Sequence, residues 1–156
     1  MRILALDPGV TTGWALFTKG APDERYTSGQ VGPEDRIWTF LESSRFASAQ
    51  FTPDLELIVM ERFQYRNALP KADLTPVKVI GIVEEWSRQR NVPVVLQTPS
   101  QRLWFTDERL ETLGLLKTPK SSWPHANDAM RHLLVYLSFG EGIQLGENVI
   151  QGLRRG

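Results

Sequence analysis

Four side chains that could bind a divalent cation stand at three separate places in the sequence. Asp7 ends the apolar run 3–6, and Glu61 ends a second apolar run, 57–60. His125 and Asp128 stand three residues apart at the start of a predicted helix, so they share one helix edge. A strand that ends in a carboxylate projects that charge past the sheet edge, where it must be solvated or bind a cation. If the two runs are neighbouring strands and the late helix packs across them, the four groups converge. Such a site suits Mg²⁺ or Mn²⁺ and phosphodiester chemistry.

Each of these residues also has a simpler explanation. Asp7 precedes a Pro-Gly pair, where Asp is common turn chemistry. Asp128 in a first helical turn is favourable to the helix dipole, and His125 could simply lie near the helix cap. Glu61 is the hardest to explain in this way, because a buried carboxylate needs a partner or an ion. His132 lies roughly 10 Å of helix axis beyond His125, and we interpret it as a surface or packing residue.

The elements that must position these residues follow from apolar runs and turn signals. Three antiparallel strands are expected, at about 2–6, 14–18 and 25–31. A helix that starts near residues 32–35, with Ile37, Trp38 and Leu41 facing inward, precedes the continuously apolar strand 57–60. A helix opened by Pro76 and a strand at 92–96, with Pro93 indicating an edge position, come next. Helical segments are then expected at 98–104, 107–113 and 125–139. This order predicts an α/β fold in one domain, 1–156, with a mixed sheet of three antiparallel and two parallel strands and helices on both faces.

The charge balance excludes an indiscriminate nucleic-acid binder. The 156 residues carry 18 basic and 18 acidic side chains, whereas such binders are usually strongly basic. A positive excess nevertheless begins directly after Glu61, where a local basic stripe could contact phosphate. Its basic residues up to position 78 are Arg62, Arg66, Lys71 and Lys78. The chain has no Cys, no apolar run near the roughly 20 residues of a membrane span, and no signal-peptide pattern. We therefore expect a cytoplasmic protein that binds no membrane.

Taken together, three segments resemble the signature segments of RuvC-type Holliday junction resolvases, which belong to the ribonuclease H-like superfamily. These segments are residues 1–9, 57–61 and 125–129, and the similarity spans about residues 1–139. The short length resembles phage-encoded members, which implies a bacterial cytosol or a phage-infected host cell. The resemblance implies a homodimer that binds a four-way DNA junction and cuts two strands symmetrically. It also implies two Mg²⁺ ions per active site, with Mn²⁺ as a substitute and no organic cofactor.

The same resemblance assigns roles to individual residues. Asp7, Glu61, His125 and Asp128 become the catalytic metal ligands, with His125 standing where some members have a carboxylate and others a histidine. Family members often place an aromatic residue after the glutamate, where it inserts at the junction. Here Phe63 and Tyr65 are both candidates, since either ring could stack on an unpaired base. The candidates for phosphate contacts are Arg62, Arg66, Lys71 and Lys78.

Other functions stay open on the sequence alone. Residues 7–11 also fit the D-x-G-x-T pattern of actin-like and sugar-kinase-type phosphate binders, although such enzymes need two lobes and 156 residues supply only one. A 3′–5′ exonuclease of the same superfamily usually carries Asp-x-Glu on its first strand, where this chain has Gly9. A flap or fork endonuclease and a non-catalytic nucleic-acid-binding module are the remaining alternatives. A cleavage assay separates the non-catalytic module from the nucleases.

Overall fold

The predicted mixed sheet is present in the computed structural model, which describes residues 1–20, 24–43, 55–64 and 73–140. The five strands are ordered β3-β2-β1-β4-β5. The first three are antiparallel neighbours, and β4 and β5 continue the sheet in parallel with β1. The strands are β1 (Arg2–Asp7), β2 (Thr12–Lys19), β3 (Glu24–Val31), β4 (Leu57–Glu61) and β5 (Val94–Gln97). Pro93 precedes β5, an edge strand, as the sequence predicted.

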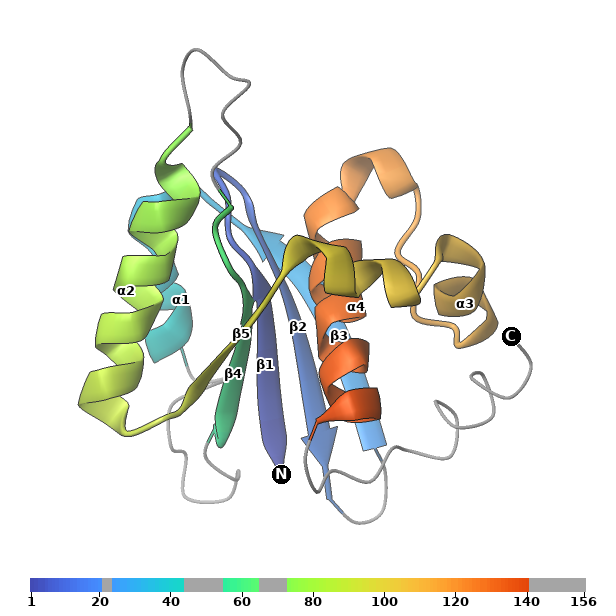
Figure 1. Ribbon diagram of the computed structural model, residues 1–156, viewed down its shortest axis with the longest axis horizontal. Coiled ribbons are helices and arrows are strands. Elements are labelled where there is room, and N and C mark those ends of the chain that lie inside the picture. Colours follow the sequence, from blue (N-terminus) through green and yellow to red (C-terminus); the bar gives the residue numbers. More distant parts are fainter. Residues whose placement is uncertain (21–23, 44–54, 65–72, 141–156) are drawn as a thin grey trace.

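The central strand β1 is buried along its whole length, and its alternating side chains feed two separate cores. Ile3 and Ala5 pack toward α4 (Pro124–Phe139), on one face of the sheet. Leu4 and Leu6 pack toward α1 (Ile37–Glu42) and α2 (Thr75–Arg90), on the other face. Figure 1 shows the sheet between these two helix layers. Helices on both faces are therefore confirmed, and they explain why β1 and β4 are apolar without alternation.

The register of β1 and β4 determines where the two strand-end carboxylates lie. Leu6 pairs with Met60 in this parallel ladder, so Asp7 and Glu61 are the next residues on neighbouring strands. The carboxyl ends of parallel strands meet at one edge of a sheet. Both acids therefore belong to the same edge, where α4 also begins.

The connections differ from the sequence expectation in detail. The segment after β5 is a 3₁₀ helix, η2 (Pro99–Trp104), followed by α3 (Asp107–Thr112). Two further 3₁₀ turns are η1 (Glu34–Arg36) and η3 (Lys120–Ser122). Trp38 was wrongly expected in the buried stripe of α1 and is 36% exposed. Ile37 and Leu41, four residues apart, share the buried face, and Trp38 follows Ile37 by about 100° around the helix.

Among the helices that the structure describes, we find none with both the length and the apolar character needed to cross a membrane.

Candidate functional site

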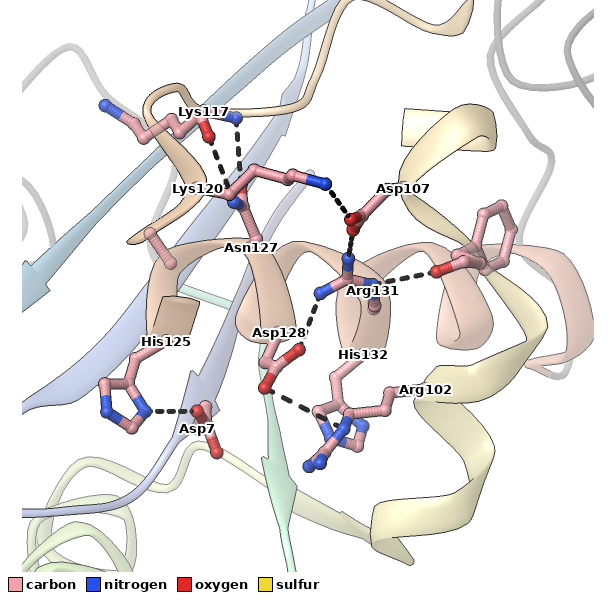
Figure 2. A network of polar contacts seen from close by, with 12 residues as sticks. Asp7, Arg102, Asp107, Lys117, Lys120, His125, Asn127, Asp128, Arg131 and His132 are labelled. Carbon is pink, nitrogen blue, oxygen red and sulfur yellow. Dashed lines mark hydrogen bonds and ion pairs between the residues drawn. The ribbon is translucent and has the colours of Figure 1, made fainter. Parts of the chain in front are cut away.

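Asp7 is buried at the end of β1 and contacts the first turn of α4. The Nδ1 atom of His125 lies 2.9 Å from Oδ2 of Asp7, and a carboxylate can only accept, so the ring donates this hydrogen bond. The turn after Asp7 is closed by Thr12, whose hydroxyl donates to the Gly9 carbonyl at 3.2 Å. Figure 2 shows the His125–Asp7 pair beside Asp128. The first and last signature segments thus meet in one place.

The start of α4 is fixed by residues from β2 and β3. Gly13 pairs with Asp7 across the sheet, and a Cβ atom at this position would lie 1.8 Å from the His125 carbonyl oxygen. Only glycine allows this close approach of strand and helix. From β3, the Gln30 side-chain oxygen accepts hydrogen bonds from the backbone N–H groups of His125 (3.1 Å) and Ala126 (3.3 Å). These contacts place the His125 side chain against Asp7.

Glu61, at the end of β4, is held by two basic side chains that the sequence did not predict as partners. Nε2 of His132 donates to its Oε2 atom at 2.7 Å, and Nη1 of Arg102 donates to the same oxygen at 2.7 Å. The other ring nitrogen of His132 lies 2.7 Å from Oε1 of Gln97, on β5. Glu61 therefore has the partners that its position after a buried strand requires.

His132 was expected to be a surface or packing residue, and the surface alternative was wrong. Its side chain is 0% exposed and links Glu61 to Gln97. The prediction placed His132 on a similar helix edge but set it apart from the site because of its distance from His125. The useful signal was the spacing of four residues from Asp128, which places both side chains on the same face of α4.

Asp128 is also ion-paired, on both of its oxygens. Oδ1 accepts a hydrogen bond from Nη1 of Arg131 at 2.6 Å, and Oδ2 lies 3.8 Å from Nε of Arg102. Arg131 itself donates to the Phe105 carbonyl at 2.8 Å. It also contacts Asp107, as Figure 2 shows. Arg102, on η2, therefore bridges Glu61 and Asp128. Sequence reasoning missed it because a single arginine after an edge strand has no local pattern to mark its partner.

The electrostatics of the site divide the carboxylates into two kinds. Burial raises the pKa of Asp7, and the negative charges of Glu61 and Asp128 raise it further, against the lowering effect of the hydrogen bond from His125. Burial also acts to raise the pKa of Glu61, but the hydrogen bond and charge of His132, together with Arg102, outweigh it and lower this pKa. The hydrogen bond to Asp7 raises the pKa of His125. Asp7 is thus the carboxylate least compensated by positive charge.

The donor set fits a hard divalent cation in its chemistry, with carboxylate oxygens and one imidazole. The positions of these side chains are not those of a metal site: within the described part of the chain, no three His, Asp or Glu side chains are grouped so that they could hold a metal ion. Glu61 and Asp128 are instead bridged by the Arg102 guanidinium. A cation shared by these carboxylates therefore requires Arg102 to move.

Of the residues predicted to contact DNA, some lie beside the site and one lies on α2. Arg62 and Phe63 line a pocket next to the site, together with Glu61, Arg102 and Pro8. Lys78 lies on α2 and pairs with Glu34 at 3.4 Å. Three candidates fall outside the described residues, namely Tyr65, Arg66 and Lys71.

Comparison with known proteins supports the fold. No protein-family model matches the chain, and no curated protein matches it in sequence. RuvC of T. thermophilus in complex with a Holliday junction substrate superposes with a TM-score of 0.62 at 20% identity, over 90% of this chain and 97% of that chain. Another structure of Thermus thermophilus RuvC gives a TM-score of 0.58 at 19% identity, over the same shares of the two chains. YeaZ from Pseudomonas aeruginosa has a TM-score of 0.45 at 20% identity, over 72% of this chain and 50% of that chain, a likeness too weak to carry an argument. The chain has a ribonuclease H-like fold similar to that of RuvC.

Proposed function

We propose that this protein is a metal-dependent, structure-selective endonuclease that hydrolyses phosphodiester bonds in branched DNA. Four-way junctions are the first candidate substrate, resolved by paired symmetric nicks. The observation that carries this proposal is that Asp7 and Glu61, at the ends of adjacent parallel strands, both contact α4, Asp7 through His125 and Glu61 through His132. The fold adds support, since the RuvC structure with a similar fold was solved with a Holliday junction substrate.

The metal would be held by the residues that the sequence singled out: Asp7, Glu61, His125 and Asp128. Mg²⁺ or Mn²⁺ at such a site supplies activation of a water molecule and neutralisation of charge on the leaving oxygen. Asp7 is suited to the central position, because it is buried between the charges of Glu61 and Asp128. A bound cation would relieve this repulsion.

The remaining residues of the site would orient groups and move protons. His132 holds Glu61 from the buried side, so that the carboxylate keeps one orientation. His125 is held through Nδ1 by Asp7, and its side chain is 42% exposed. Its Nε2 atom is the nitrogen that would bind a cation or exchange a proton with solvent or substrate. Arg62 and Phe63, beside Glu61, would contact phosphate and an unstacked base.

A non-catalytic branched-DNA-binding protein is the second candidate. The observation that favours it is the pairing of Glu61 and Asp128 with arginine and histidine side chains. Homodimer formation and phage origin belong to the proposal in the same way as the substrate, and both stay predictions.

The test is incubation with labelled four-way, flap and linear duplex DNA, with and without Mg²⁺ or Mn²⁺. We expect cutting of branched DNA only, dependent on the ion and abolished by a chelator. Binding of branched DNA without cutting under every ion would favour the non-catalytic candidate. Cutting of linear duplex from its 3′ ends would indicate an exonuclease.

A further inference from the structure

We propose that Arg102 serves as the resident cation of the metal-free site, and that its guanidinium competes with a divalent ion for Glu61 and Asp128. This inference rests on the proposed metal-dependent function and adds a control of metal affinity within the same site. It concerns a residue of η2 that comes from outside the three signature segments.

The contacts of Arg102 resemble those expected of a shared cation. Nη1 lies 2.7 Å from Oε2 of Glu61, and Nε lies 3.8 Å from Oδ2 of Asp128. Its charge also interacts favourably with Asp7. One side chain thus compensates three of the four proposed ligands, in the place where a metal ion would do so.

Arg102 and a divalent cation exclude one another. A guanidinium group stays protonated at any pH a protein tolerates, so it cannot give up its charge when a cation arrives. Both would be held between the same two carboxylates, Glu61 and Asp128, where their like charges repel at close range. Metal binding at Glu61 and Asp128 therefore requires the Arg102 side chain to turn away.

The surroundings of Arg102 allow this movement. Its side chain is 31% exposed and borders two pockets, one beside Arg62 and Phe63 and one beside Asp107 and Asp128. The backbone of η2 is fixed at its start, where the Gln101 side chain accepts a hydrogen bond from the Thr98 N–H at 2.7 Å. The guanidinium can therefore leave while the helix stays in place.

Arg131 provides the contrast within the same site. It also pairs with Asp128, but its side chain is only 14% exposed and is tied to the Phe105 carbonyl and to Asp107. These additional partners hold Arg131 in place whether or not a metal is bound. Of the two arginines, Arg102 is the one whose side chain can move away when a metal ion binds.

The experiment measures Mn²⁺ binding to the DNA-free protein by titration calorimetry, with circular dichroism to verify folding. We expect Arg102→Gln to bind Mn²⁺ at least about tenfold more tightly than the wild type, a factor that corresponds to about 1.4 kcal/mol. Arg102→Lys keeps the charge but cannot span both carboxylates, so its affinity should lie between the two. The matched control is Arg88→Gln, which removes an exposed arginine paired with Glu85 on α2 and should leave the affinity unchanged.

The outcomes separate this inference from the proposed function. Equal Mn²⁺ affinities of wild type and Arg102→Gln, or weaker binding by the variant, would overturn the competition while leaving a metal-dependent nuclease intact. Absence of Mn²⁺ binding by every variant would overturn both. If Arg102→Gln does not fold, Arg102→Lys decides: tighter binding than wild type supports the competition, and equal or weaker binding rejects it.

Discussion

Replacing His132 with alanine should be among the most costly single changes in this protein. The imidazole is fully buried and joins Glu61 on β4 to Gln97 on β5. Its removal takes a hydrogen-bond partner from the buried Gln97 and from the partly buried Glu61, and it leaves a cavity where α4 packs against the sheet. We therefore expect a loss of stability as well as a loss of order at Glu61.

The magnitude follows from the two contacts. A hydrogen bond to a charged group contributes about 1.5–3 kcal/mol and a neutral one about 0.5–1.5 kcal/mol. The cavity adds to this sum, because the surrounding structure closes only in part. The free energy of unfolding should fall by about 3–5 kcal/mol, against a total of about 5–15 kcal/mol for an ordinary domain.

The assay is urea unfolding followed by tryptophan fluorescence, for which the buried side chains of Trp14 and Trp86 are suitable reporters. The chain offers a matched control in its only other histidine. His125→Ala removes a 42% exposed imidazole and leaves the buried Asp7 without this donor, so it should cost about 1–3 kcal/mol, less than His132→Ala.

A double-mutant cycle with Glu61→Gln isolates the contact itself. The coupling energy between residues 61 and 132 should be about 1.5–3 kcal/mol, as for a hydrogen bond to a charged group. The reasoning is refuted if His132→Ala costs no more than His125→Ala, or if the coupling energy is indistinguishable from zero.

Three further substitutions test the charge of Asp7, the close approach of strand and helix at Gly13, and the stacking role of Phe63. Because burial and neighbouring negative charge raise the pKa of Asp7, its native form retains a proton to higher pH than its unfolded form, and stability falls as pH rises through this window. The free energy of unfolding of Asp7→Asn should therefore exceed that of the wild type by about 1 kcal/mol in metal-free buffer at pH 7. The difference between their urea midpoints should disappear below about pH 4. Gly13→Ala places a methyl group 1.8 Å from the His125 carbonyl oxygen and should cost about 3 kcal/mol or more in the same assay, whereas Gly81→Ala, which meets nothing within 4 Å on a helix, should stabilise by about 0.5–1 kcal/mol. Phe63→Ala should lose about tenfold more cleavage activity on intact four-way junctions than on nicked ones if its ring stacks on an unpaired base, and equal losses would remove this role.

The sequence predicts the fold well where the signals are local. The apolar runs before Asp7 and Glu61 mark buried strands, and the apolar spacing after His125 marks the last helix to within one residue of its start at Pro124. What brings these parts together is the parallel register of β1 and β4, which follows from the order of the elements.

The partners of the carboxylates could not be predicted in the same way. Arg102 meets Glu61 because η2 leaves the edge strand at the carboxylate end of the sheet, 41 residues further along the chain. His132 meets Glu61 across 71 residues. The spacing of His132 from Asp128 indicates only a shared helix face. Which side chain that face meets on the sheet depends on how helix and sheet are rotated against each other.

The central claim is that the strand-end carboxylates and the first two turns of α4, with His125 and Asp128, form one metal-dependent site that cuts branched DNA. Its most direct test compares wild type, Asp7→Asn and Asp128→Asn on a labelled four-way junction in Mg²⁺, with binding and cutting measured on the same samples. We predict that all three proteins bind the junction and that only the wild type cuts it. Cutting by Asp7→Asn at the wild-type rate, or wild-type cutting that persists in a chelator, would contradict the claim.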